Sequence, residues 1–444
     1  MYIKFITGFT IPCILLGNVL VAQSIQTAGT IVSQDQVPIS FSDYFIDKTL
    51  RIDYLLGGNH QEEIVYFAGM KQEPFWGGPH KNLVDLFNYG TYRYCLYDSL
   101  SGRLLFLRGF GTLFQEWEGT PEALTIRRTF PMTAVMPFPK RTIRFVIEKR
   151  ANATGKFEKI FELFINPVNY FIVKENIRHI PITRLKESGE PGNHVDIAFI
   201  AEGYTMQEMG KFRKDAARFC EYFLKVKPFS DLADKFNFYA VESPSEESGV
   251  SIPGKNIYVN TSLSSSFYTF DMDRYLTTSD TKSIYDIAAN VPYDIIFVLV
   301  NSQQYGGGGF YNHYGESTVD HRVSEIVAMH EFGHTFAGLA DEYYTNNVTN
   351  SDFYNPQVEP WEANITTNVG FTAKWKKMIL PGTPVPTPRK DEYKEVIGMF
   401  EGGGYVEKGV YSPMMDCRMK SNEAQGFCPV CQEAIRKMIL FYCD

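Results

Sequence analysis

The chain contains no block of lysine and arginine residues, and its acidic side chains outnumber its basic ones. It has 51 Asp and Glu residues against 43 Lys and Arg, which gives a formal net charge of -8 at pH 7. Nucleic acids and anionic membrane surfaces attract clustered positive charge, so the sequence excludes both as main partners. Internal repeats are also missing. With 44% hydrophobic and 21% charged residues, the composition is that of a folded protein with a sizeable core.

Long apolar runs are missing after the first 24 residues, so we expect no transmembrane span in the mature chain, because a span needs about 20 apolar residues. The start of the chain is different. Lys4 precedes the apolar run 5–21, and the small residues Ala22 and Ser24 follow it. This order predicts a secretory signal peptide over residues 1–24 and export to the periplasm, the cell surface or the medium. Proline, glycine and asparagine inside the run weigh against an uncleaved anchor.

Cysteine is scarce, and removal of the signal peptide would leave an even number. In an exported chain such a number predicts at least one disulfide, although the sequence does not give its connectivity. The C-x-x-C at 428–431 is also compatible with a redox motif, but it lacks the second C-x-x-C of a zinc ribbon. The six remaining cysteines are Cys95, Cys220, Cys417, Cys428, Cys431 and Cys443.

The length of 444 residues predicts two or three domains, since single hydrophobic cores stop growing near roughly 250 to 300 residues. Short β-rich runs separated by turn residues predict an all-β sandwich domain over 25–170, which has no catalytic cluster. We interpret it as an accessory domain for folding or substrate positioning, with a carbohydrate- or protein-binding module as the alternative. A polar, turn-forming stretch at 186–193 is a plausible boundary. We expect the second domain to cover 190–444.

The second domain begins with a pattern typical of an α/β fold. The apolar run 195–204 predicts a buried strand, and Thr205 with Glu208 forms a capping box before a helix with apolar residues at helical spacing up to position 223. Further buried strands are expected at 237–243 and 293–301. A last helix is expected to begin near Pro429, because proline suits the first turn.

The strongest chemical signal is H-E-x-x-H at 330–334. Apolar residues at helical spacing predict a helix here, with Asp320 as a candidate N-cap. His330 and His334 then project from one face, about one turn apart, which suits two zinc ligands. Glu331 can reach a water molecule bound by the metal and act as its general base. A chance match in this chain has a probability of roughly 1%.

The segment HEFGHTFAGLADEY, residues 330–343, resembles the zinc signature of the IgA-peptidase family, whose members are secreted, metzincin-like zinc metalloendopeptidases. VDIAFIAEGYT, SPSEESG, NSQQYGGGGFYN and FCPVC are similar to other blocks of that family. The resemblance covers roughly 190–444, and the β-rich front resembles the family's N-terminal domain. It implies an α/β zincin catalytic domain with an upper part, 190–338, that holds the motif helix and a lower part, 339–444, that holds a Met-turn and the C-terminal helix.

The resemblance also implies candidates for further site residues. Metzincins follow the pattern HExxHxxGxxH, whereas here Gly338 stands one place later and Ala340 cannot bind a metal, so the third ligand is expected to be Asp341, with Glu342 as the alternative. The family's C-x-M order favours Met419 as the methionine under the metal, although Met414 and Met415 are close by. It further implies that Cys417 pairs with one cysteine of the C-x-x-C, Cys428 or Cys431.

A glycine run just before the motif helix predicts either a flexible loop or an edge strand whose backbone pairs with an extended substrate. The candidates for this edge are Gly307, Gly308, Gly309 and Tyr311. Several tyrosines, among them Tyr311, Tyr314, Tyr343, Tyr405 and Tyr411, could polarise the scissile carbonyl, and the sequence does not choose between them.

The function expected from all of this is hydrolysis of internal peptide bonds in a protein or glycoprotein substrate, with one catalytic zinc ion and Glu331 as the base. Two alternatives remain open at this point: an exopeptidase or other amide hydrolase, and a binding protein on a zincin scaffold. The oligomeric state and the cleavage preference are not encoded in any pattern that we recognise.

Overall fold

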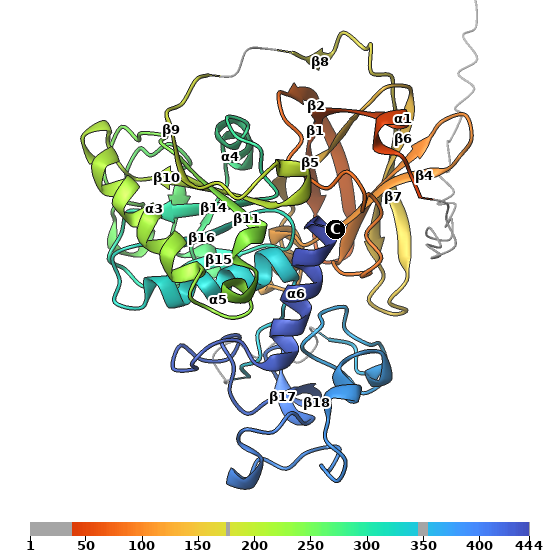
Figure 1. Cartoon of the computed structure of the whole chain (residues 1–444), viewed down its shortest axis with the longest axis vertical. Helices are drawn as coiled ribbons and strands as arrows, with labels where there is room; N and C mark the ends of the chain where they lie inside the picture. Colours follow the sequence, from red (N-terminus) through yellow and green to blue (C-terminus); the bar gives the residue numbers. More distant parts are fainter. Residues whose placement is uncertain (1–37, 175–177, 345–353, 444) are drawn as a thin grey trace, which may run out of the picture.

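The structure is a computed structural model that describes residues 38–174, 178–344 and 354–443. The predicted signal peptide, 1–24, therefore lies outside the described residues. Within the described ranges, no helix has the length and apolar character needed to cross a membrane. The architecture is mixed α/β, with several separate sheets (Figure 1).

The N-terminal region contains two four-stranded sheets and two short helices, α1 (Phe41–Tyr44) and α2 (Leu113–Glu118). Residues at every second position of the first strand, such as Leu50, Ile52 and Tyr54, belong to one buried core together with residues of the other sheet. The first sheet has the order β5 (Arg128–Pro139), β1 (Phe45–Gly58), β2 (Glu63–Glu73), β8 (Ile172–Val173), and the second has the order β4 (Leu104–Phe110), β3 (Tyr92–Asp98), β6 (Ile143–Arg150), β7 (Phe157–Ile165).

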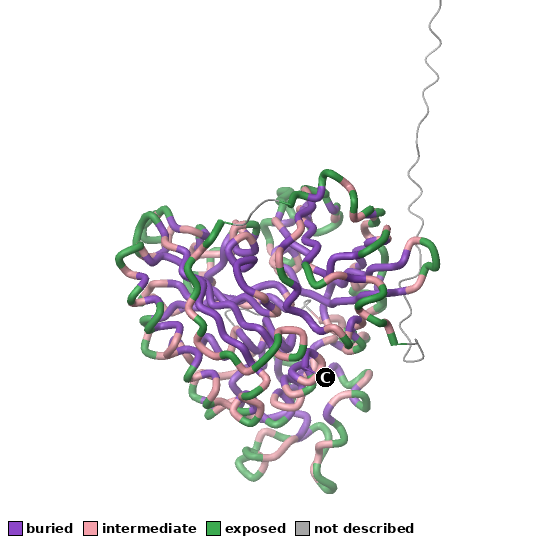
Figure 2. The backbone as a smooth tube through the Cα atoms, turned by 45° about the horizontal axis from the view of Figure 1, so that its top comes forward, coloured by how far each residue is buried: buried purple, intermediate pink, exposed green. Residues whose placement is uncertain are grey.

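A six-stranded sheet forms the centre of the second region. Its four inner strands are parallel, and three of them consist almost wholly of buried apolar residues, as expected of strands that are covered on both faces. Figure 2 shows this continuous buried layer. The order is β15 (Gly307–Gly309), β16 (Gly315–Thr318), β14 (Ile295–Val300), β10 (Val195–Glu202), β11 (Phe236–Val241), β9 (Ile182–Lys186).

Three helices cover one face of this sheet and one helix covers the other. α3 (Met209–Phe223), α5 (Ser324–Ala337) and α6 (Pro429–Cys443) share a core cluster with one set of strand residues, while α4 (Thr281–Ala288) packs with the opposite set. The capping box of Thr205 and Glu208 is present ahead of α3, and α6 begins at Pro429; both predictions are confirmed.

The expected N-cap of the motif helix was wrong. α5 starts at Ser324, after a turn, and Asp320 lies outside it. The Asp320 carboxylate instead accepts a hydrogen bond from Lys211 Nζ at 3.1 Å. Asp320 thus joins the motif helix region to α3 and does not cap a helix.

The remaining chain, after α5, forms a smaller lower region. It contains the hairpin β17 (Phe400–Gly403) and β18 (Val406–Ser412) and several short 3-10 helices. α6 runs from this region back to the N-terminal sheets, where Asn82 Nδ2 donates to Phe441 O at 2.8 Å (Figure 1). A further small ladder, β12 (Ser265–Ser266) with β13 (Thr277–Thr278), lies ahead of α4.

The two regions meet over buried polar contacts. Arg51 of β1 is 0% exposed and donates to Asp286 of α4 at 2.8 Å, while Tyr293 donates to Glu73 at 2.8 Å. β9 pairs with β11 of the six-stranded sheet, so this sheet begins ahead of the turn at 186–193 that the composition marked as a boundary. β9 directly follows the segment that links the two regions. The amino-acid composition therefore does not show where this segment ends and the sheet begins.

Candidate active site

One helix face brings three of the expected site residues together. α5 carries His330, Glu331 and His334, and the Nε2 atoms of the two histidines lie 3.1 Å apart. The Nδ1 atoms face away: His330 Nδ1 lies 3.0 Å from Arg418 O, and His334 Nδ1 lies 2.6 Å from Leu339 O. A proton on each Nδ1 would be donated to these carbonyls, which leaves both Nε2 lone pairs directed at one point.

The helix ends at a glycine that redirects the chain toward the same point. Gly338 has a φ of 57°, and a Cβ there would lie 2.6 Å from the Trp361 ring, so both backbone and packing require glycine. Three residues later, Asp341 Oδ1 lies 2.9 Å from His330 Nε2 and 3.4 Å from His334 Nε2. The structure thus groups Asp341 with the histidines.

The alternative third ligand, Glu342, faces the other way. Its Oε1 accepts from Asn364 Nδ2 at 3.0 Å and lies 3.3 Å from Cys431 Sγ. Successive residues of an extended chain point to opposite sides, so the two acidic side chains cannot share one site.

The chemistry of His330, His334 and Asp341 fits a divalent metal ion. Ligand bonds of about 2.0 to 2.2 Å in a tetrahedral site place ligand atoms roughly 3.3 Å apart, close to the three distances above. Asp341 Oδ1 is buried and makes no hydrogen bond within the described residues, while Oδ2 accepts from the Tyr405 hydroxyl. Two neutral imidazoles and a carboxylate are ordinary zinc ligands, and a cation would satisfy the orphaned oxygen.

The electrostatics agree with this fit. Burial lowers the pKa of His334, but the carboxylate of Asp341 outweighs burial and raises this pKa to about 9. Burial raises the pKa of Asp341, but the two histidines hold it well below its usual value. In the absence of a metal, protons on the histidines therefore take the place of the cation.

Glu331 lies beside the metal-binding candidates without contacting them. Its carboxylate makes no hydrogen bond to any residue that the structure describes, and burial raises its pKa, against the opposing effect of the two histidines. An ideal Cβ on Gly307 of β15 would lie 2.9 Å from Glu331 Cγ and 3.1 Å from Oε1. Because Gly307 has no side chain, there is room for the Glu331 carboxylate at this position.

The glycine run forms an edge strand, which was one of the two structures expected for it. β15 is the outer strand of the six-stranded sheet and pairs antiparallel with β16. Its outer side is partly used, because Leu276 N donates to Gly307 O at 3.3 Å. Tyr311 does not lie on this edge: it is 3% exposed, and its ring stacks on Trp361. Of the four candidates for a substrate edge, only the three glycines lie on this strand.

Met419 lies under the helix that carries the histidines. It is 0% exposed, and its Sδ would be 2.7 Å from a Cβ built on Gly333, which stands between the two histidines in α5. Met414 is also buried, but no described contact links it to α5 at this point. Met419 therefore packs under the helix segment between the two histidines, and its assignment to the Met-turn stays a prediction from the family resemblance.

Two of the candidate tyrosines are close to the metal-binding residues. The Tyr405 hydroxyl donates to Asp341, and the Tyr343 ring stacks on the His330 ring with centroids 6.4 Å apart. Tyr314 is buried against Thr278 instead. The sequence, with its many tyrosines, gave no way to choose between these candidates. The turn at 404–405 in the lower region is what brings Tyr405 to Asp341.

A carboxylate of the N-terminal region reaches the same place, and the sequence analysis missed it. Glu116 of α2 accepts a hydrogen bond from the Tyr275 hydroxyl, and the backbone of Tyr275 forms a bridge with Gly307. Burial raises the pKa of Glu116 to about 7, and the charges of His334, Asp341 and Glu331 also act on it. No local pattern marks Glu116, because more than 150 positions separate it from its partner.

The expected disulfide is wrong for this structure. Cys417 Sγ and Cys431 Sγ are 3.7 Å apart, whereas a disulfide bond is about 2.05 Å long, and no described cysteine is bonded to another. Cys428 lies in the same group. The even cysteine number was a poor guide, because three thiols share one site and cannot all pair within it.

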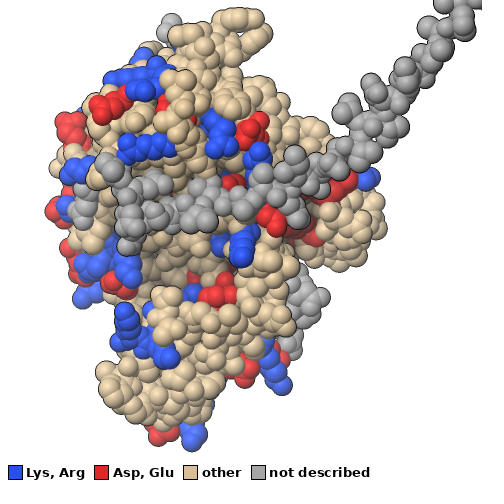
Figure 3. Space-filling model, turned by 90° about the vertical axis from the view of Figure 1, so that its right-hand side faces the viewer, with Lys and Arg blue, Asp and Glu red and all other residues tan. Residues whose placement is uncertain are grey.

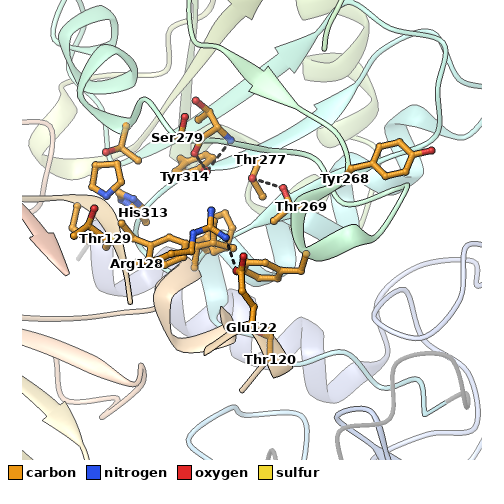
Figure 4. Close-up of a pocket in the computed structure, with 18 of the residues that line it drawn as sticks. Thr120, Glu122, Arg128, Thr129, Tyr268, Thr269, Thr277, Ser279, His313 and Tyr314 are labelled. Atoms are coloured by element: carbon orange, nitrogen blue, oxygen red, sulfur yellow. Dashed lines mark hydrogen bonds and ion pairs between the residues drawn. The ribbon is translucent and has the colours of Figure 1, made fainter. Parts of the chain in front are cut away.

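A cavity of about 570 Å³ lies between the two regions but away from these residues. Figure 4 shows its lining, in which Thr120, Glu122 and Arg128 of the N-terminal region face Tyr268, His313 and Tyr314. None of His330, Glu331, His334 or Asp341 lines it. Burial lowers the pKa of His313 to about 3, so this histidine stays neutral. We assign the cavity no part in the chemistry.

Comparison with known families gives two matches that together cover most of the chain. The sequence profile described as IgA Peptidase M64 matches residues 183–397 and 389–439, and the profile described as Peptidase M64 N-terminus matches residues 40–162. The chain belongs to the IgA peptidase M64 family. It is therefore a metallopeptidase, and its substrate is a protein. Among curated proteins, none matches the chain.

The surface of this M64 peptidase shows no large field of one sign on the face seen in Figure 3, where acidic and basic side chains alternate. This distribution agrees with the net charge of -8 and with the absence of a basic block. The family assignment and the charge pattern both favour a polypeptide partner of mixed charge.

Proposed function

We propose that the protein is an exported zinc metalloendopeptidase that cleaves internal peptide bonds of protein or glycoprotein substrates. The observation that carries the proposal is the convergence of His330 Nε2, His334 Nε2 and Asp341 Oδ1 beside a Glu331 carboxylate with no hydrogen-bond partner among the described residues. We further propose that residues 190–444 form a metzincin-like zincin domain and that 25–170 form a β-sandwich accessory domain.

One zinc ion would be held by the two histidines and Asp341, a set of nitrogen and oxygen donors that zinc accepts. When bound, zinc supplies Lewis acidity, which polarises a carbonyl oxygen and lowers the pKa of water. The carbonyls of Arg418 and Leu339 fix the orientation of the imidazoles, and Tyr405 fixes that of Asp341.

Glu331 is the proposed general base and acid. Its carboxylate takes a proton from the attacking water and delivers it to the amine that leaves the cleaved bond. Burial raises its pKa toward the working pH, which suits a group that must both accept and release a proton. The glycine at position 307 leaves room for this carboxylate.

The substrate is proposed to lie extended along β15. Edge strands offer unpaired backbone groups to a peptide, and Gly308 and Gly309 present no side chain to obstruct its approach. A peptide that pairs along a strand edge continues past both of its ends, which favours cleavage inside a chain over removal of a terminal residue.

An exopeptidase is the competing function, and Glu116 is the observation that favours it. A carboxylate beside the metal-binding residues could bind the free α-amino group of a substrate, and Glu116 lies close enough for the charges of His334 and Glu331 to act on its pKa. Its hydrogen bond with Tyr275 weighs against this role. A binding protein without activity is disfavoured, because such a chain has no need of Glu331.

Mapping of cleavage positions distinguishes these functions. The full-length mature chain is incubated with a mixed peptide library, and the products are identified by mass spectrometry with and without a zinc chelator. We expect chelator-sensitive cleavage at internal bonds, including peptides with acetylated N-termini and amidated C-termini. Removal of terminal residues only, and none from blocked peptides, would reject the endopeptidase proposal in favour of the exopeptidase.

A further inference from the structure

A second group of metal-binding side chains lies in the lower region, apart from the three residues of the candidate active site. We call it the cysteine cluster, and it consists of Glu342, Cys417, Cys428 and Cys431. One ligand atom from each residue lies within 4.8 Å of every other. All four residues are buried, with Glu342 and Cys431 0% exposed. Such burial excludes the solvent access that a redox C-x-x-C requires.

The distances inside the cysteine cluster match those of a tetrahedral zinc site. Zinc–sulfur bonds of about 2.3 Å place two sulfurs about 3.8 Å apart, and a sulfur and a carboxylate oxygen about 3.5 Å apart. Cys417 Sγ lies 3.7 Å from Cys431 Sγ, and Cys431 Sγ lies 3.3 Å from Glu342 Oε1. These separations are too long for a disulfide and close to the edges of one coordination tetrahedron.

The carboxylate is the feature that a disulfide does not explain. Glu342 Oε2 is buried and makes no hydrogen bond to any described residue, and Oε1 accepts only from neutral or weak donors, Asn364 Nδ2 and Cys431 Sγ. No positively charged group among the described residues donates a hydrogen bond to it, which makes its burial costly, and a disulfide brings no positive charge. A divalent cation among the four side chains satisfies the carboxylate and the thiols together.

Two features of the surroundings stabilise negative sulfur against burial, which by itself raises the pKa of Cys417 and of Cys431. Cys428 N donates to Cys417 Sγ at 3.2 Å, and the cluster lies at the N-terminus of the 15-residue helix α6, where Cys431 occupies the first turn. Both the amide and the helix dipole stabilise negative sulfur. Lys420 Nζ is buried nearby without a hydrogen-bond partner among the described residues, and the charges of Glu342 and Cys417 act on it. Its positive charge offsets one of the two surplus negative charges that three thiolates and a carboxylate leave around one divalent ion.

We propose that Cys417, Cys428, Cys431 and Glu342 bind a second zinc ion, which has a structural role. Three soft thiolates select zinc over magnesium or calcium, and four protein ligands complete a tetrahedral site with no position left for substrate. This site is separate from the active site and does not depend on the proposed function.

The position of the second ion explains what it stabilises. Glu342 directly follows Asp341, Cys417 stands two residues before Met419, and Glu342 N donates to Met419 O at 2.8 Å. The ion joins the chain that follows α5 to the turn under the active site and to the start of α6. It therefore holds Asp341 and Met419 in place from below, as a support for the catalytic ligands.

The test measures metal content and the absorption of a cobalt-substituted protein. The full-length mature chain, purified without chelator or reductant, is expected to contain about two zinc ions, and the His330→Ala/His334→Ala double variant about one. Cobalt bound in the double variant should show a sulfur-to-metal charge-transfer band, which nitrogen and oxygen ligands cannot produce. This signal is independent of peptidase activity, so failure of the proposed function would leave it unaffected.

Variants and thiol chemistry complete the test. Glu342→Gln should lower the affinity for the second ion while the band persists, Cys431→Ser should reduce the band strongly, and Cys220→Ser, a buried cysteine of α3, should change neither. If the cysteine variants do not fold, titration of the wild-type protein with a mercurial reagent should release one zinc ion as the thiols of the cluster react. A single zinc ion in the wild type, none in the histidine double variant, and a mass that rises by two hydrogens on reduction would overturn the proposal in favour of a disulfide.

Discussion

Gly307→Ala adds one methyl group beside the proposed general base. The backbone of Gly307 does not lie in the left-handed region, so alanine fits the strand, and the effect is steric. The new Cβ would lie 2.9 Å from Glu331 Cγ and 2.9 Å from Glu316 O. Carbon atoms in contact are about 3.5 to 4.0 Å apart, so the Glu331 side chain or the strand has to move by roughly 0.6 Å or more.

A displacement of this size lies below the roughly 1 Å that costs about 100-fold in rate, so we expect kcat/KM to fall by about 10- to 100-fold, or about 1.4 to 2.7 kcal/mol of transition-state stabilisation. The zinc content should not change, because no metal-binding residue contacts position 307. The assay compares kcat/KM on a quenched peptide, zinc per chain and thermal unfolding for wild type and variant.

Gly69→Ala in β2 is the matched control, because its Cβ would meet no atom within 4 Å, and it should keep full activity. A folded Gly307→Ala protein with activity within about twofold of wild type would refute the position that we give to Glu331. Loss of zinc together with activity would show that the edge strand supports the metal-binding residues and not the base.

Three further predictions concern the support of the site and the fold. Tyr405→Phe removes the hydrogen bond to Asp341 Oδ2. It should weaken zinc binding, measured by competition with a chelator, by roughly 10- to 100-fold. An unchanged zinc affinity would mean that the Tyr405 hydroxyl does not orient Asp341. Arg51→Met removes a 0% exposed cation from the buried Glu73 and the partly buried Asp53 and Asp286. It should lower the free energy of unfolding, measured in urea, by about 3 to 5 kcal/mol. A loss below about 1 kcal/mol would contradict the role of this contact between the regions. Asp341 raises the pKa of His334 to about 9 in the metal-free site, so a proton competes with zinc for this histidine below that pH. Zinc affinity should therefore fall by about tenfold per pH unit between pH 8 and pH 7. A zinc affinity that does not change with pH in this range would exclude the competition.

Much of the candidate site was accessible from the sequence because its parts are local. His330 and His334 share one helix face, with Glu331 next to them, and the helical repeat fixes their relative positions. Asp341 followed from a glycine three residues before it, since the turn at Gly338 needs a left-handed backbone that the structure indeed has. Helical spacing also predicted α3, apolar runs predicted the buried strands of the central sheet, and Pro429 predicted the start of α6.

The missed parts depend on chain segments that meet only in the folded protein. Glu116 of α2 reaches the candidate active site from the N-terminal region, and no spacing rule links it to Tyr275. The cysteine pattern suggested a disulfide, because a linear reading does not show that Glu342 lies among the thiols. Asp320 has the composition of an N-cap, yet an intervening turn moves the start of α5 to Ser324.

The most direct test of the central claim is the Glu331→Gln variant, which keeps the size of the side chain and removes its basicity. Peptide cleavage and zinc per chain are measured on the same preparation of mature protein. The proposed mechanism predicts unchanged zinc content and a loss of kcat/KM by about 100- to 10,000-fold, the usual contribution of a general base. Activity within tenfold of wild type, with zinc retained, would contradict the role of Glu331.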